Sequence, residues 1–279
     1  MTACGPITAE EQTRFATLCT AACGRPSGER PLARGGIGTL GEKTLHAVLK
    51  DFFEPDPDAH EIRVGSYVAD IVGEGGIVEV QTGNFQSLRK KLAAFLEAAP
   101  VTVVYPVTHF KWLLWVDPES GDISPRRKSP RAGNFPDAMF ELYKIMPLLR
   151  HPNLRLCLLL VDLEEYRLRD GWSADKKRGS HRYERIPLAL AGRLDLRTCA
   201  DWCSPEAQAA FFPTSLPSPF TSKDYAKAAR LNIHAAQTAL RVLAHMGAAE
   251  RCGKNGNLYL YQTTPRTMTV FAYRQPGMS

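Results

Sequence analysis

Residues 67–81, with the sequence YVADIVGEGGIVEVQ, constrain the fold of this chain more than any other stretch. Two runs rich in β-branched residues flank the turn sequence GEGG, which predicts a β-hairpin. Asp70 and Glu79 then lie on neighbouring strands. A carboxylate within an apolar strand is unfavourable by several kcal/mol if it is buried without a partner, so two of them require compensation. A divalent cation would supply it, because Mg²⁺ is held by one or two carboxylates together with phosphate oxygens and water.

A third carboxylate precedes the hairpin. Glu42 lies near the start of the segment LGEKTLHAVLKDFF, whose apolar residues recur at helical spacing. The order is therefore an acid on a helix, an acid on a strand, and a Glu-x-Gln sequence from Glu79 to Gln81 on the next strand. The alternative for each acid is a solvent-facing position that carries no chemistry, because short motifs match by chance.

This order resembles the core of the PD-(D/E)XK nuclease superfamily, in which a helical Glu is followed by Asp and then by (Asp/Glu)-x-Lys. The matched positions are Glu42, Asp70, Glu79 and Gln81. The resemblance implies an α/β fold with a mixed central sheet flanked by helices, as in restriction endonucleases. It also implies metal-dependent phosphodiester hydrolysis of DNA, in which Asp70 and Glu79 hold Mg²⁺ or Mn²⁺ and Glu42 binds a second ion or positions water.

Gln81 departs from the family pattern, in which Lys is the most frequent residue. The family Lys is thought to activate the attacking water or to stabilise charge on the phosphate, whereas an amide orients water but carries no charge. Another cation must replace it, and we favour Lys111 or Lys90 over Lys43 and Lys91. The alternative is a non-catalytic DNA-binding or regulatory protein that uses a degenerate nuclease-like core as a scaffold.

Basic residues gather in two segments. Lys and Arg number 35 against 29 Asp and Glu, and the net charge of +6 favours a polyanionic partner if the charge is clustered. In residues 123–135 we expect phosphate contacts from four cations, with a solvated loop as the alternative: Arg126, Arg127, Lys128 and Arg131. A second charged loop mixes cations with aromatic rings that can stack on bases: Lys176, Lys177 and Arg178, with Trp172 and Tyr183.

A linker rich in proline and serine begins at Pro213, so we expect two domains, residues 1–212 and 213–279. The second domain reads as a helix, a short turn, a second helix and two strands. This order resembles the winged helix-turn-helix family, whose second helix enters the DNA major groove and whose wing approaches the backbone. By position, the resemblance implies DNA contacts from four residues: His234, Gln237, Arg241 and Lys254. Winged helices that serve as protein–protein modules are the alternative.

Composition places the chain among soluble globular proteins, with 44% hydrophobic and 23% charged residues. No apolar run reaches the roughly 18 residues that a membrane span requires, and the first residues lack the pattern of a signal peptide. The seven cysteines are an odd number, which favours reduced thiols. We therefore expect a cytoplasmic protein that binds DNA and no membrane, and that acts as a homodimer or with a partner protein when it cuts both strands.

Overall fold

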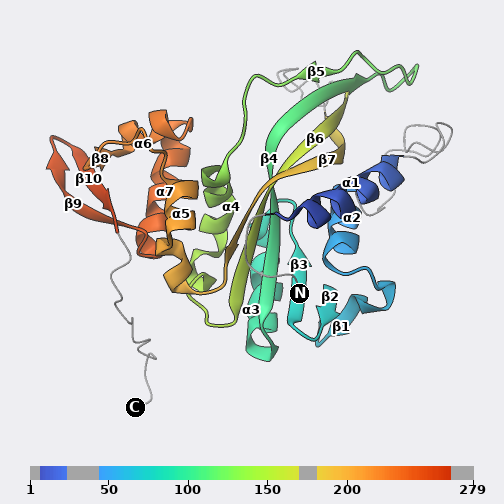
Figure 1. Ribbon diagram of the computed structural model, residues 1–279, viewed down its shortest axis with the longest axis horizontal. Helices are drawn as coiled ribbons and strands as arrows, with labels where there is room; N and C mark the ends of the chain where they lie inside the picture. The colour runs from blue at the N-terminus through green and yellow to red at the C-terminus, as the bar shows by residue number, and fades with distance from the viewer. Residues whose placement is uncertain (1–6, 24–43, 170–180, 265–279) are drawn as a thin grey trace.

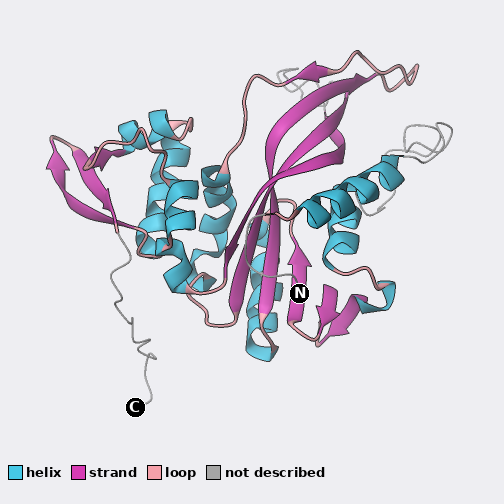
Figure 2. Cartoon of the chain, in the orientation of Figure 1, coloured by secondary structure: helices cyan, strands magenta, loops and turns pink. Residues whose placement is uncertain are grey.

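A mixed sheet forms the centre of the protein, with helices on both of its faces (Figures 1 and 2). The computed structural model describes residues 7–23, 44–169 and 181–264. Within these ranges the sheet has seven strands in the order β1-β2-β3-β4-β6-β7, and β5 pairs with β4 outside that path. The predicted α/β class with a mixed central sheet flanked by helices is confirmed.

The first half of the sheet is an antiparallel meander that follows two helices. The elements are α1 (Ala9–Cys23), α2 (Thr44–Phe53), the 3₁₀ turn η1 (Pro57–Ala59), β1 (His60–Val64), β2 (Tyr67–Gly73) and β3 (Gly76–Val80). The predicted hairpin is confirmed, because β2 pairs antiparallel with β3. The sequence analysis missed β1, since its residues HEIRV are polar, and only its pairing with β2 makes it a strand.

A crossover through α3 (Phe85–Ala98) joins β3 to the parallel strand β4 (Val101–Val116). These elements form a βαβ unit, and the apolar residues of α3, which recur at helical spacing in the sequence, are buried. By sequence alone, the segments VTVVYPV and HFKWLLWV are predicted to be two strands, yet they form one. The ladder with β6 (Leu154–Leu168) continues on both sides of an irregularity between Thr108 and Lys111, so β6 keeps the two halves of β4 in one strand.

Short turns and one long strand complete this part of the chain. Between β4 and β6 lie β5 (Arg127–Lys128), η2 (Phe135–Ala138), α4 (Met139–Leu142) and η3 (Tyr143–Leu148). After β6 come β7 (His181–Leu196), η4 (Cys199–Cys203) and α5 (Pro205–Phe211). Residues 181–187 were expected in a loop but belong to β7, because their backbone pairs with the far end of β6 despite their polar composition.

Each face of the sheet buries its own apolar cluster. Val103, Leu156 and Leu158 face α3 and α4, whereas Val104, Cys157 and Leu159 face α1 and α2. The alternation along β4 and β6 follows from the two-residue period of a strand. Functional side chains on the sheet can therefore be assigned to the α3 face or to the α2 face.

Residues 220–263 form a helix pair followed by a hairpin. The elements are β8 (Phe220–Thr221), α6 (Ser222–Ala228), α7 (Ile233–His245), β9 (Ala249–Asn255) and β10 (Leu258–Thr263). Thr221 and Asn232 cap the two helices through side-chain oxygens. The apolar side of α7 belongs to the same buried cluster as the α3 face of the sheet, so this unit packs as a continuation of the main body.

None of the helices that the structure describes is both long and apolar enough to cross a membrane.

Candidate functional site

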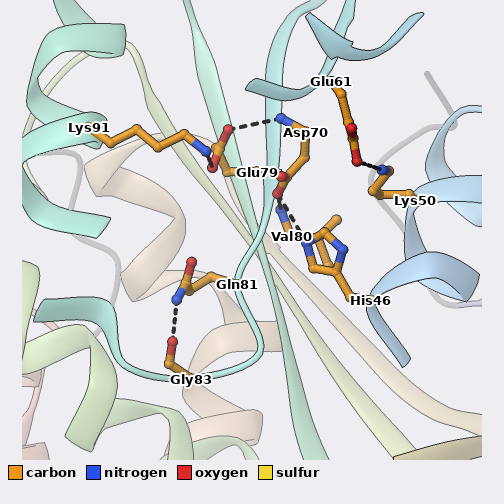
Figure 3. A network of polar contacts seen from close by, with 9 residues as sticks. All are labelled: His46, Lys50, Glu61, Asp70, Glu79, Val80, Gln81, Gly83 and Lys91. Carbon is orange, nitrogen blue, oxygen red and sulfur yellow. Dashed lines mark hydrogen bonds and ion pairs between the residues drawn. The ribbon is translucent and has the colours of Figure 1, made fainter. Parts of the chain in front are cut away.

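Asp70 and Glu79 lie next to each other where the pairing of β2 with β3 ends (Figure 3). The backbone N–H of Asp70 donates to Glu79 Oε1 at 3.1 Å. The N–H of Val80 donates to Asp70 Oδ2 at 2.8 Å. Each carboxylate therefore accepts a hydrogen bond from the backbone of the other strand, in place of the ladder that stops at Ile71 and Val78. The prediction that both acids lie on neighbouring strands is confirmed.

Glu79 is buried, with 1% of its surface exposed, and faces α3. Lys91 of α3 places its Nζ atom 2.6 Å from Glu79 Oε2. Burial, and next the negative charge of Asp70, raise the pKa of Glu79 to about 7, although the hydrogen bond and charge of Lys91 oppose that rise. Glu79 can therefore exchange a proton near neutral pH.

Asp70 stays ionised beside Glu79, although the pKa of Glu79 is raised. His46 of α2 places Nε2 3.3 Å from Asp70 Oδ2. Burial acts to raise the pKa of Asp70, but the hydrogen bond and charge of His46 and the N–H of Val80 outweigh burial and lower it. Two adjacent carboxyls with pKa values displaced in opposite directions are typical of acid and base pairs in active sites.

Gln81 follows β3 directly. Its backbone N–H donates to Val104 O at 2.9 Å, which holds the end of β3 against β4. Its side-chain amide donates to Gly83 O within the loop that leads to α3 (Figure 3). Arg185 of β7 donates to Thr82 O in the same loop at 3.0 Å. The amide of Gln81 is thus used to shape the loop between β3 and α3.

Lys91 is the lysine that the structure pairs with Glu79, whereas the sequence analysis favoured Lys111 or Lys90 as the catalytic cation. Lys90 is exposed on α3, because one residue along a helix turns the side chain by about 100°. Lys111 instead places Nζ 3.6 Å from Oε2 of Glu165, a buried carboxylate on β6.

Four of the predicted site residues lie outside the described ranges: Glu42, Lys176, Lys177 and Arg178. In the ranges that are described, no group of three or more His, Cys, Asp or Glu side chains is placed to hold a metal ion. A metal at this site would therefore rest on Asp70 and Glu79 together with ligands from elsewhere.

The sequence analysis missed His46 and ranked Lys91 below Lys111 and Lys90. His46 lies four residues after Glu42, a spacing that would place both on one helical face, and this signal was available in the sequence. Lys50, one turn further along α2, is 4% exposed and contacts Glu61 Oε1 at 3.1 Å (Figure 3). The polar side of α2 thus lies over β1 and β2.

Carboxylates and aromatic rings elsewhere in the protein contact several cations of the basic segment 123–135. Arg126 contacts Glu164 Oε1 at 2.9 Å and lies over the Trp112 ring at 4.3 Å. Lys128 lies 3.9 Å from the Phe110 ring centroid, and Arg131 forms an ion pair with Asp137. Arg127 is exposed. The phosphate contacts expected of these four cations stay a prediction, and three of the four already have a carboxylate or ring partner in the protein.

The predicted contact residues of the C-terminal unit are all at its surface. His234, Gln237 and Arg241 are exposed on α7, on the side opposite to its buried residues. Lys254 is exposed on β9, with Nζ 5.1 Å from the Tyr259 ring centroid. The hairpin turn lies at Gly256 and the residue after it, so Lys254 is close to the tip.

Comparison with known proteins gives the family. The family described as "Domain of unknown function (DUF8091)" matches residues 43–197, more than half of the chain. The chain belongs to the DUF8091 family. The DUF8091 region runs from the start of α2 to the end of β7, so it contains Asp70, Glu79 and Lys91, whereas α6 and α7 follow it.

A relative matches a longer part of the chain. A protein of Treponema pallidum (strain Nichols), described as "Uncharacterized protein", is 30% identical over 230 residues, which cover 82% of this chain and 88% of the relative. The match is longer than the DUF8091 region alone. No solved structure matches the chain.

Proposed function

We propose that this DUF8091 protein is a DNA-binding protein with metal-dependent endonuclease activity. The observation that carries the proposal is the pair of Asp70 and Glu79 on adjacent strands, with Lys91 in contact with Glu79. Two acids and one cation around a strand end are the groups that phosphodiester hydrolysis requires, because the reaction develops negative charge on the phosphate.

The order of elements supports a restriction-endonuclease-like core. The chain runs α2, β1, β2, β3, α3, β4, with the first three strands antiparallel and β4 parallel to β3. Asp70 lies on the second of these strands and the Glu-x-Gln sequence begins on the third. This is the placement that the resemblance to the PD-(D/E)XK superfamily implies.

The donor set fits Mg²⁺ or Mn²⁺. Two carboxylates lie together at a largely buried position, and only one ammonium group among the described residues forms an ion pair with Glu79. Oδ1 of Asp70 accepts no hydrogen bond from the described part of the chain, so it remains available as a ligand. Asp70 and Glu79 would hold the ion, which would supply Lewis-acid stabilisation of the phosphate charge.

The chain's own residues have separate roles in this proposal. Lys91 supplies a positive charge from α3, which the amide of Gln81 cannot supply. In the metal-free protein the pKa of Glu79 is about 7, so binding of the ion near neutral pH would release a proton from it. His46 and the N–H of Val80 hold Asp70 ionised and oriented. Water would enter along the exposed part of Asp70, whose side chain is 20% accessible.

The C-terminal unit supports DNA binding in the same proposal. A helix pair followed by a hairpin is the arrangement of a winged helix, and the exposed row of His234, Gln237 and Arg241 on α7 would face the major groove. This row also favours the second candidate function, a DNA-binding protein without catalysis, because it needs no carboxylate.

The deciding experiment incubates the purified protein with supercoiled plasmid in Mg²⁺ or Mn²⁺. Nicked or linear product is compared for the native protein, Asp70→Asn and the matched control Asp51→Asn, an exposed aspartate on α2. Nicking that is lost in Asp70→Asn and in EDTA, but retained in Asp51→Asn, supports the nuclease. DNA binding that survives EDTA and Asp70→Asn, without nicking, favours the non-catalytic protein.

A further inference from the structure

A cavity of about 380 Å³ lies on the α2 face of the sheet, and neither Asp70 nor Glu79 lines it. Its floor includes Ile71, Val78 and Thr102, and the end of α2 at Phe53 closes one side. The volume falls within the range of small-molecule sites, about 300–1,000 Å³. The cavity therefore has room for a small organic ligand.

Two arginines line one wall of the cavity. Arg155 of β6 and Arg197, just after β7, are the next residues beyond Leu156 and Leu196, the last pair of the ladder. Like charges directly opposite on neighbouring strands destabilise a sheet. Neither guanidinium makes an ion pair or a hydrogen bond within the described part of the chain. An anion between them would remove the repulsion.

Arg193 lines the same wall, but two carboxylates of the protein neutralise its charge. Its Nη1 lies 2.9 Å from Glu11 Oε1 of α1, and its Nε lies 2.7 Å from Asp195 Oδ2. All four atoms belong to side chains that are 7% or 8% exposed. Arg193 is thus paired with two carboxylates. Arg155 and Arg197, which line the same wall, form no ion pair with any described residue.

The opposite wall is acidic. Glu54, at the end of α2, and Glu74, in the turn between β2 and β3, also line the cavity. No ion pair among the described residues joins these acids to Arg155 or Arg197. Asp195 also lines the cavity, but its carboxylate is paired with Arg193. A ligand that fills the cavity would meet Arg155 and Arg197 at one end, Glu54 and Glu74 at the other and apolar side chains between them.

We infer that this cavity binds a small organic anion that carries a phosphate or carboxylate at one end and an amino group or other N–H donor at the other. Arg155 and Arg197 would grip the anionic group, since paired guanidinium groups match phosphate and carboxylate geometry. Glu54 and Glu74 would accept from the donor end. Mononucleotides with an exocyclic amino group and amino acids share this chemistry.

The site is separate from the carboxylate pair. Helix α2 carries His46 at its first turn, beside Asp70, and Phe53 at its last residue, beside the cavity. At about 1.5 Å per residue, the two positions are about 10 Å apart along the helix axis. The inference therefore does not depend on nuclease activity.

The test measures binding of inorganic phosphate, AMP and glutamate to the full-length protein by isothermal titration calorimetry and thermal unfolding. We expect AMP or glutamate to bind, and Arg155→Gln and Arg197→Gln each to weaken binding about tenfold or more. Arg63→Gln, an exposed arginine on β1, is the matched control and should leave the affinity unchanged. Arg155→Lys should lose part of the affinity, because it keeps the charge but not the planar fork.

Stability without ligand separates binding from a structural role. Removing one of two repelling charges should leave the melting temperature of ligand-free Arg197→Gln unchanged or raised, while the ligand-induced rise is lost. A lowered melting temperature in ligand-free Arg197→Gln overturns the inference, and so does a failure of AMP and glutamate both to bind. Equal binding of all three probes, phosphate included, would also contradict it, because the acidic wall would then have no role.

Discussion

Lys91 Nζ on α3 lies 2.6 Å from Glu79 Oε2 on β3. The contact joins the helix of the βαβ crossover to the strand that precedes it, and it places a cation at a buried carboxylate. The position two residues after Glu79 is occupied by Gln81, which has no charge. The charge at this site therefore comes from the helix.

Replacing Lys91 tests this contact. In the proposed nuclease, Lys91→Met should abolish plasmid nicking, because it removes the cation beside Glu79. Lys90→Met is the matched control, since Lys90 is the neighbouring residue and is exposed. Equal nicking by both variants would show that Lys91 has no part in the reaction.

The pKa of Glu79 predicts a pH dependence of stability. Folded Glu79 keeps its proton up to about pH 7, whereas the unfolded chain releases it near pH 4.5. The folded state binds more protons in this window, so the free energy of unfolding should fall by up to about 3 kcal/mol as pH rises through it. In Glu79→Gln this contribution to the slope should be absent. Urea denaturation across the window measures both proteins.

The matched control for that experiment is Glu97→Gln, on the exposed side of α3. Its free energy of unfolding should follow the native pH dependence. A native slope in Glu79→Gln as well would assign the pH dependence to other groups.

His46 is expected to hold Asp70 in its ionised form. His46→Ala should raise the pKa of Asp70, because the hydrogen bond and the charge that lower it are removed and burial remains. The stability that ionised Asp70 contributes is lost as pH falls through its folded-state pKa, so the variant should lose it at a higher pH. Carboxyl carbon NMR of Asp70 gives the pKa directly. An unchanged value would mean that the Val80 N–H and the charge of Lys91 lower the pKa of Asp70 without His46.

Replacing Leu240 of α7 tests whether the C-terminal unit and the main body unfold together. Leu240 is fully buried in the cluster that also contains Met139 and Phe211. Leu240→Ala should lower the free energy of unfolding by about 2–5 kcal/mol. Far-UV circular dichroism and tryptophan fluorescence should still report one transition. Gln237→Ala, exposed on the same helix, is the control, and two separate transitions would contradict a shared core.

Salt dependence tests the proposed DNA contacts. Arg127 and Arg241 are exposed, and neither forms an ion pair within the described residues. If each neutralises a phosphate, Arg127→Ala and Arg241→Ala should each reduce the slope of log affinity against log salt by about one. Arg63→Ala on β1 should leave the slope unchanged. Fluorescence anisotropy with duplex DNA over a range of salt measures it.

Local periodicity was enough to predict several elements. The β2–β3 hairpin follows from β-branched runs around a glycine-rich turn, and α3 follows from apolar residues at helical spacing. The positions of Asp70 and Glu79 on neighbouring strands follow from the same pattern. These features depend on residues that are near one another in the chain, so their signal is complete in the sequence.

Long-range pairing decided the elements that the sequence analysis missed. Strand β1 is polar and exists because β2 pairs with it, and residues 181–187 are a strand because β6 extends beside them. Strand β4 is one element, since β6 bridges its irregularity. Backbone hydrogen bonds to a distant strand are independent of side-chain pattern, which is why composition pointed to loops.

The sequence by itself determined which residues carry charge and on which element most of them lie, because helix and strand periods are local properties of the chain. Only the tertiary structure decided which charges meet. Lys90 and Lys91 are adjacent and identical in chemistry, yet only Lys91 reaches Glu79, because the way α3 packs on the sheet turns one side chain inward and the next outward.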